Sequence, residues 1–278
     1  MSLALALLLI VFVVLVLLDA PIAVALGLSS MFYLLIADAA PMIVVAQRAV
    51  AGINSFTLLA IPLFLLAGLL MVHGGLAPRI IAFCAALIGR RTGGLAMVMI
   101  IACMMFGSLS GSGVADVVAI GTMMLPAMRD QGYAPGFSAS ALGCAGSLGT
   151  VIPPSIVLIV YGLTASVSIG DLFLATVTPG LMLASFYIIY ILIRCYANPE
   201  MGPPISDAEL DIPMSEKLRK MRGVILPVGV AVTVLGSIYG GIASVTEAAA
   251  MGVVGVFLSA AIRREVTWTL IRDSLKQT

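Results

Sequence analysis

The fold is decided by two short stretches, Gly107-Ser-Leu-Ser-Gly-Ser-Gly113 and Gly149-Thr-Val-Ile-Pro-Pro-Ser155. Each interrupts sequence that is otherwise apolar enough to lie in a membrane. Inside a bilayer every backbone amide and carbonyl needs a hydrogen-bond partner, so non-helical chain persists there only around a cavity lined by protein or water. A pair of such interruptions is the best sequence indication of a transport site. The two stretches therefore predict helices that break at bilayer depth around a solute-binding cavity.

The sequence on either side of these stretches is typical of a membrane protein. Of the 278 residues, 62% are hydrophobic and only 10% are charged, which is far from the composition of a soluble domain. Several uncharged runs approach or exceed the roughly 20 residues that a membrane-crossing helix needs. These runs cover residues 3–18, 22–37, 55–72, 93–115, 172–193, 223–245 and 248–262. We therefore predict an all-α polytopic membrane protein with a re-entrant helical hairpin and a discontinuous helix.

The charged and reactive side chains argue against several classes of protein. The net charge is +1, from 14 basic and 13 acidic residues, which gives no basis for nucleic-acid binding. The four cysteines are scattered without C-x-x-C spacing, which argues against structural zinc, a disulfide framework and a redox couple. The single histidine, His73, precedes two glycines and is expected at a helix end rather than as a catalytic base. We therefore expect no catalytic residues and no organic cofactor.

The first interruption predicts a hairpin of two helices. One helix enters over residues 97–106, the chain unwinds at residues 110–113, and Asp116 starts the returning helix. Freed carbonyls and serine hydroxyls at the tip would suit a small hard cation, and the amides at the new helix start would favour an anion. Two alternatives stay open. Small residues four apart also allow close helix packing, and Asp116 could simply cap the returning helix.

The second interruption predicts a helix with an unwound centre. Glycines recur at every third position, at residues 143, 146 and 149, and the adjacent prolines Pro153 and Pro154 remove two backbone donors. One proline would be enough for a kink, so two argue for a break. Carbonyls near residues 147–152 would then lack their normal partners and could bind sodium. An extramembrane loop is the less favoured alternative.

A polar connector divides the chain. Residues 198–221 hold four prolines, five acidic residues and three basic ones, so we expect a first membrane repeat over residues 1–197 and the start of a second over 222–278. The first repeat would contain scaffold helices, the hairpin at 97–130 and the broken helix at 136–168. Its first two runs are expected as retained helices that bend at Asp19-Ala-Pro21. Arg194 and the basic end of the connector favour a cytoplasmic location for this end of the repeat.

Several motifs, in order along nearly the whole chain, resemble those of one transporter family. They are residues 54–68 (Asn-Ser-Phe-Thr-Leu-Leu-Ala-Ile-Pro-Leu-Phe-Leu-Leu-Ala-Gly), residues 106–116, Ile152-Pro-Pro-Ser-Ile156, Pro179-Gly180 and Thr246-Glu-Ala-Ala-Ala250. Together they resemble the large membrane subunit of tripartite ATP-independent periplasmic (TRAP) transporters, the DctM type. Each motif alone is modest, and the set is specific.

The resemblance implies a sodium-coupled permease of the bacterial inner membrane that works by an elevator mechanism. Its cargo would be an organic acid, such as a C4-dicarboxylate, a keto acid or sialic acid. A small four-helix membrane subunit (DctQ type) and a periplasmic substrate-binding protein (DctP type) would be its partners. The cation site is expected at Ser110, Ser112, Gly149 and Thr150, with sodium as the coupling ion. The full predicted set of sodium- and substrate-binding residues is Asn54, Ser55, Ser108, Ser110, Gly111, Ser112, Gly113, Asp116, Gly149, Thr150, Pro153, Pro154 and Ser155.

One departure from the family pattern affects the expected activity. Large subunits of this type carry a second inverted repeat with its own hairpin and broken helix, whereas the sequence resembles only the first repeat and the opening of the second. We therefore expect an incomplete architecture that does not transport alone. Other possibilities are an ion-coupled carrier without a binding protein and an inactive truncated fragment with a scaffold role. An intramembrane hydrolase is disfavoured because no base accompanies Asp116 or the serines.

Overall fold

A computed structural model describes residues 3–37, 40–88, 91–204 and 214–278. Every regular element in these ranges is a helix, which confirms the all-α prediction. The chain forms two compact units, Met1–Ser55 and Phe56–Thr278, and each is described by itself.

The first unit contains three helices. The helices α1 (Leu3–Leu17) and α2 (Ile22–Ala37) pack on each other, and α3 (Ile43–Ile53) follows them. The bend between α1 and α2 lies at the predicted Asp19-Ala-Pro21, where Asp19 takes a left-handed backbone conformation with φ 62°. Most large side chains of α1 and α2 are exposed, as expected for helices whose surroundings are apolar.

The second unit contains the two predicted interruptions. Its elements in chain order are η1 (Phe56–Leu59), α4 (Ala60–His73), α5 (Leu76–Ile88), α6 (Gly94–Ser110), α7 (Gly113–Asp130), α8 (Pro135–Val151), α9 (Ile156–Ala165), α10 (Ile169–Ala197), η2 (Pro199–Met201), α12 (Met214–Tyr239), α13 (Val245–Ile262) and α14 (Trp268–Gln277). The hairpin is formed by α6 and α7, and the discontinuous helix by α8 and α9. His73 ends α4, as predicted, and its Nδ1 lies 3.0 Å from the Ser274 hydroxyl of α14.

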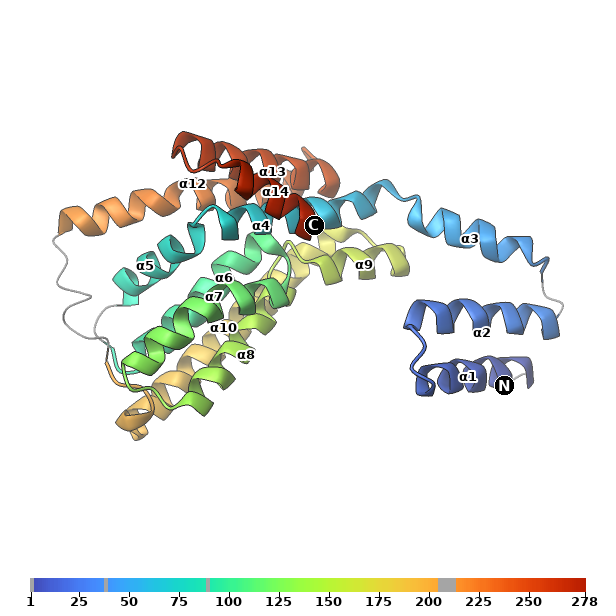
Figure 1. Ribbon diagram of the computed structural model, residues 1–278, viewed down its shortest axis with the longest axis horizontal. Coiled ribbons are helices and arrows are strands. Elements are labelled where there is room, and N and C mark those ends of the chain that lie inside the picture. The colour runs from blue at the N-terminus through green and yellow to red at the C-terminus, as the bar shows by residue number, and fades with distance from the viewer. Residues whose placement is uncertain (1–2, 38–39, 89–90, 205–213) are drawn as a thin grey trace. The chain divides into compact units, whose positions relative to one another are not determined.

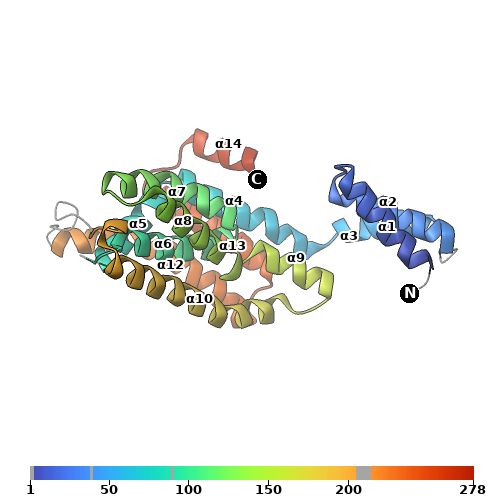
Figure 2. The ribbon, with the colours of Figure 1, turned by 90° about the horizontal axis from the view of Figure 1, so that it is seen from below.

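Helix α6 lies at the centre of the second unit (Figures 1 and 2). It packs against α4, α5, α7, α8 and α10, and its residues from Gly94 to Ile100 are all buried. A helix that is apolar on every side belongs in a protein interior, so this one forms the core that carries the hairpin tip. Helix α13 runs along α4, and Thr246 at its start donates a hydrogen bond to the carbonyl of Phe56 at 3.1 Å.

The outer helices expose apolar surface. Among the described residues, three helical stretches are long and apolar enough to cross a membrane: Phe56–His73, Ile169–Ala197 and Val245–Ile262. The pair α8 and α9 adds a fourth if it is counted as one bent span. Leu174, Phe186 and Ile193 of α10 are more than half exposed, which suits contact with lipid and not with water.

The loops at one end of the second unit are tied together by Tyr133. Its hydroxyl accepts a hydrogen bond from the Leu95 amide at 3.2 Å and donates one to the carbonyl of Pro203 at 2.9 Å. Burial raises the pKa of this hydroxyl, so it stays protonated and able to donate. The Gly93 amide donates to the Gly202 carbonyl at 2.9 Å. These bonds place the start of α6 and the end of α10 at the same level.

The division into two repeats stays a prediction. Part of the expected connector, residues 205–213, lies outside the described residues. The rest of it contains η2 and the first residues of α12, which begins at Met214.

Candidate functional site

The hairpin tip consists of two non-helical residues. Helix α6 continues through Ser110, and α7 begins at Gly113, so only Gly111 and Ser112 are unwound. Gly111 takes φ 64°, a left-handed conformation that glycine adopts without steric cost, and its amide bonds the Gly107 carbonyl at 2.9 Å. Ser112 is extended, and its hydroxyl accepts the Ala115 amide at 3.4 Å as the N-cap of α7. The break is therefore shorter than the sequence predicted.

The second break separates α8 from α9, whose axes differ by 43°. Residues 152–155 are non-helical and include Pro153 and Pro154. The Ser155 hydroxyl, which is buried, donates to the Thr150 carbonyl at 2.7 Å. The prolines prevent the chain from continuing as a helix, and the serine satisfies one of the carbonyls that the break frees.

The two breaks lie against each other. The Ile156 amide, at the start of α9, donates to the Gly111 carbonyl of the hairpin tip at 3.1 Å. A Cβ atom added to Gly111 would lie 3.0 Å from the Pro154 carbonyl oxygen. The first amides of a helix have no partner within it, so the tip supplies one of the missing acceptors. The sequence therefore brings both unwound segments to one place, as predicted.

Asp116 lies beneath the tip and is fully buried. The Ser110 hydroxyl donates to its Oδ1 atom at 2.5 Å, and the Ser112 amide in turn donates to the Ser110 oxygen at 3.2 Å. Its second oxygen, Oδ2, has no hydrogen-bond partner in the described part of the chain. A buried carboxylate oxygen without a partner is costly, so this atom is the strongest indication of a cation or proton at the site.

Two helices, α6 and α8, approach Asp116 of α7 so closely that only glycine fits. A Cβ atom on Gly149 of α8 would lie 1.8 Å from Oδ2, and one on Gly107 of α6 would lie 2.7 Å from it. Gly107 and Gly149 also face each other, with 2.6 Å between an added Cβ and the Gly149 Cα. Gly107 therefore allows close helix packing, which was one of the two alternatives for the small residues. The same glycine also lines the polar site around Asp116.

The predicted site residues divide into those that meet and those that do not. Ser108 lies apart: its hydroxyl bonds the Met105 carbonyl at 2.7 Å, and it faces a hollow lined by α12. Asn54 and Ser55 belong to the first unit, so their expected place near the cavity stays a prediction. The residues that the structure brings together at the two breaks are Ser110, Gly111, Ser112, Gly113, Asp116, Gly149, Thr150, Pro153, Pro154 and Ser155.

Two details of the sequence interpretation need correction. Asp116 does not cap or start α7, because Ser112 holds the capping position and the helix begins at Gly113. Some of the carbonyls before the second break also have hydrogen-bond donors, contrary to the expectation. The Leu148 carbonyl accepts the Ile152 amide at 2.8 Å, and the Thr150 carbonyl accepts the Ser155 hydroxyl. The α-helix continues to Val151, so the unwound segment starts at residue 152, three residues after the start expected at residue 149.

Sequence reasoning missed two contacts that shape the site. Gly68 of α4 lies against Ser110, with 2.8 Å between an added Cβ and the Ser110 Cβ. Gly113 faces Gly146, whose carbonyl oxygen would lie 2.4 Å from an added Cβ. The glycine spacing of α8 was visible in the sequence and is the signal that could have revealed the second contact. Nothing in the sequence indicates which residue Gly68 meets.

The site could hold a small cation. Serine and threonine hydroxyls and backbone carbonyls keep a free lone pair after accepting or donating one bond, and hard cations prefer such oxygen ligands. When ionised, the Asp116 carboxylate adds a negative charge, and its buried Oδ2 atom has no hydrogen-bond partner among the described residues. The described residues contain no cluster of three histidine, cysteine or acidic side chains, so a transition-metal site has no support there.

With this geometry established, comparison with known proteins identifies the family. The model of the DctM component of the tripartite ATP-independent periplasmic transporters matches residues 9–278. The chain belongs to this family. A DctM-family chain with several apolar spans is a multi-pass membrane protein.

Three relatives illustrate the match. The C4-dicarboxylate TRAP transporter large permease protein DctM of Vibrio cholerae is 42% identical over 243 residues, covering 86% of this chain and 52% of the relative. The protein of the same name from Rhodobacter capsulatus is 38% identical, covering 89% of this chain and 58% of the relative. The isethionate TRAP transporter permease protein DctMQ of Oleidesulfovibrio alaskensis is 36% identical, and the match covers 89% of this chain and 38% of the relative.

The DctM-family chain spans about half the length of the two C4-dicarboxylate relatives, 52% and 58%. All three relatives are named as permeases, in agreement with the expectation that the protein is not an enzyme.

Proposed function

We propose that this chain is the permease component of a sodium-coupled tripartite system that imports organic acids across a bacterial inner membrane by an elevator mechanism. The hairpin and the broken helix would form one wall of the ion and substrate site. Sodium would be held by oxygens of Ser110, Ser112, Gly149 and Thr150, with Asp116 supplying charge from behind the tip.

The observation that carries this proposal is the unpartnered Oδ2 atom of Asp116 beneath two unwound segments. Burying a carboxylate without a partner is expensive, and a bound cation beside the Ser110–Asp116 pair would offset that cost. A structural scaffold would need the glycine contacts but would gain nothing from a buried charge.

The organic anion would bind beside the same two breaks. The unwound segments 107–116 and 143–155 contain no lysine or arginine, so attraction must come from elsewhere. The helices α7 and α9 both start at the site, and the N-terminal amides that the Ser112 hydroxyl and the Gly111 carbonyl do not occupy would favour an anion. The relatives named for C4-dicarboxylates and isethionate support a small anion as cargo, and the choice among such anions stays open.

The tripartite description of the family supports two partners. A small DctQ-type membrane subunit would pack beside this chain, and a DctP-type periplasmic protein would deliver the substrate.

The sodium proposal can be tested by thermal stability in detergent. Sodium at ten times its dissociation constant should stabilise the purified chain by about 1.4 kcal/mol, a rise in Tm of roughly 3–5 °C over equal potassium. Asp116→Asn should remove the difference between the two salts. Asp171→Asn, an exposed change at the start of α10, should keep it. Equal melting in sodium and potassium for the unmodified chain would contradict a sodium site.

The tripartite proposal needs a transport assay. Proteoliposomes that contain the chain with DctQ- and DctP-type components should accumulate a C4-dicarboxylate under an inward sodium gradient. Uptake that is unchanged when the binding protein is left out would favour a carrier of another kind. If the chain binds sodium but vesicles with all three components take up no dicarboxylate, the chain would have only a scaffold role.

A further inference from the structure

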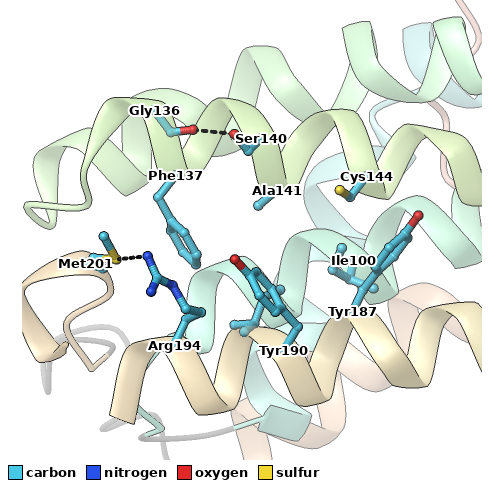
Figure 3. A pocket seen from close by; sticks show the side chains of 11 residues that line it. Ile100, Gly136, Phe137, Ser140, Ala141, Cys144, Tyr187, Tyr190, Arg194 and Met201 are labelled. Carbon is cyan, nitrogen blue, oxygen red and sulfur yellow. Dashed lines mark hydrogen bonds between the residues drawn. The ribbon is translucent and has the colours of Figure 1, made fainter. Parts of the chain in front are cut away.

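A groove on the outside of the second unit, far along α8 and α10 from the two breaks, is not used by the proposed function. It lies between the first half of α8 and the last half of α10, and Ile100 of α6 forms its floor (Figure 3). Its volume is about 270 Å³. That is at the lower end for small-molecule sites, and a helix about 10 Å wide could not enter it. A single extended chain could.

The two walls of the groove differ in character. Apart from Phe137, the α8 wall is made of small residues, including Ser140 and Cys144, and no atom lies within 4 Å of a Cβ added to Gly136. The α10 wall carries Tyr187 and Tyr190, and Phe137 projects from α8 toward Tyr190 (Figure 3). The small residues of α8, the tyrosines of α10 and the Phe137 ring form a narrow slot.

One cationic group stands at the mouth of this slot. Arg194 points from α10 toward Phe137, and its Nη2 atom lies 3.6 Å from the Met201 sulfur (Figure 3). Among the described residues, no carboxylate is found in an ion pair with Arg194. A guanidinium in a half-buried site favours an oxyanion that can accept two hydrogen bonds.

The groove also lies at the right depth for a lipid. The apolar run of α10 ends at Arg194, and α8 begins at Pro135, beside the loops that Tyr133 ties together. The mouth of the groove is therefore at the boundary of the apolar region, and the slot extends from it toward Tyr187 and Cys144, inside that region. Basic pockets between helices at a membrane boundary are suited to anionic head groups.

We infer that this groove binds an anionic phospholipid, with the phosphate at Arg194 and one acyl chain along the slot between α8 and α10. The Tyr190 hydroxyl, which points toward the mouth, can donate a second hydrogen bond to the phosphate (Figure 3). An apolar helix of another protein would leave the guanidinium without an anion and could not enter the slot. The inference does not depend on sodium coupling or on transport.

A tryptophan placed in the groove tests the inference. Trp268 is the single tryptophan of the chain, so Trp268→Phe with Phe137→Trp gives one reporter inside the slot. Lipids brominated on the acyl chain quench nearby tryptophans. At equal mole fraction in mixed vesicles, brominated phosphatidylglycerol should quench several-fold more than brominated phosphatidylcholine, because one basic side chain contributes roughly a fivefold preference for anionic lipid.

Arg194→Gln should abolish that preference, whereas Arg129→Gln, an exposed change that removes the same charge just before α8, should keep it. The native protein offers a second readout: Cys144 is the exposed cysteine and the other three are buried, so phosphatidylglycerol should slow its alkylation by N-ethylmaleimide.

Equal quenching by both lipids would overturn the inference, because it would mean contact with lipid in general. Protection of Cys144 by inorganic phosphate to the same extent would also overturn it, because the site would then bind a soluble anion. Absence of quenching by any brominated lipid would show that the groove is closed to the bilayer.

Discussion

At Gly149 the lack of a side chain is what allows the Asp116 carboxylate to lie between α7 and α8. The contact is closer than any real Cβ could make, since an added atom would be 1.8 Å from Oδ2. Gly143, on the same helix, has nothing within 4 Å of an added Cβ. Both glycines lie inside α8, and only Gly149 contacts another helix. Substituting each one therefore distinguishes the effect of the lost contact space from the effect of helix propensity.

We predict opposite outcomes for alanine at these two positions. Gly149→Ala should lower the stability of the protein by roughly 1–3 kcal/mol, because α8 or the Asp116 side chain must move to admit the methyl group. Gly143→Ala should leave stability unchanged or raise it by up to about 1 kcal/mol, since alanine favours a helix over glycine. Thermal melting in detergent measures both. A Gly149→Ala variant as stable as Gly143→Ala would show that the packing around Asp116 is loose.

At the scale of elements, the hairpin tip and the broken helix act as one unit because each completes the other's backbone hydrogen bonds. The Gly111 carbonyl accepts the first amide of α9, which has no partner within its own helix. The Pro153-Pro154 break then keeps α9 from joining α8 and leaves that amide facing the tip. The stability of the break therefore depends on the tip and not on the prolines alone.

Hydrogen exchange at the Ile156 amide tests this dependence. Gly111→Ala should speed its exchange by roughly fivefold or more, because a left-handed conformation costs a residue with a Cβ about 1–2 kcal/mol and the new atom would press on Pro154. Gly132→Ala is the matched control. Its φ of 85° imposes a similar cost, but nothing lies within 4 Å, so exchange at Ile156 should not change. If both variants behaved alike, the bond between tip and α9 would be unimportant.

The sequence predicted these elements well and their contacts poorly. Proline pairs and glycine–serine runs break helices through local sterics, so the breaks near Ser112 and Pro153 could be located from residue type alone. The burial of Asp116 by Gly107 and Gly149, and the approach of Gly68 to Ser110, depend on how separate helices meet. The conformational preferences of single residues contain no information on contacts between helices that are distant in sequence. The same limit explains why residue type places Ser108 with the site, although its hydroxyl bonds the Met105 carbonyl and it lines the hollow beside α12.

At the scale of the whole second unit, charge differs between its two ends. The end with the Tyr133-bound loops carries Arg91, Arg129 and Arg194. The opposite end has an open hollow of about 550 Å³ between η1, α9 and the starts of α10 and α13, lined partly by serine and threonine. No lysine or arginine occurs in residues 56–60, 161–180 or 236–250, which form that end. Positive side chains mark cytoplasmic loops, whereas acidic ones have little influence.

We therefore predict that the Arg91–Arg129–Arg194 end faces the cytoplasm, which places the hydroxyl-lined hollow outside. Single cysteines at the two ends of α10 test this in a Cys144→Ser background, since the other native cysteines are buried. Val167 and Ala197 are both exposed. In intact cells a membrane-impermeant maleimide should label Val167→Cys and should spare Ala197→Cys until the membrane is permeabilised. The reverse pattern would mean that the hairpin opens outward, because α6 and α7 begin and end beside Ala197 and reach the site from that side.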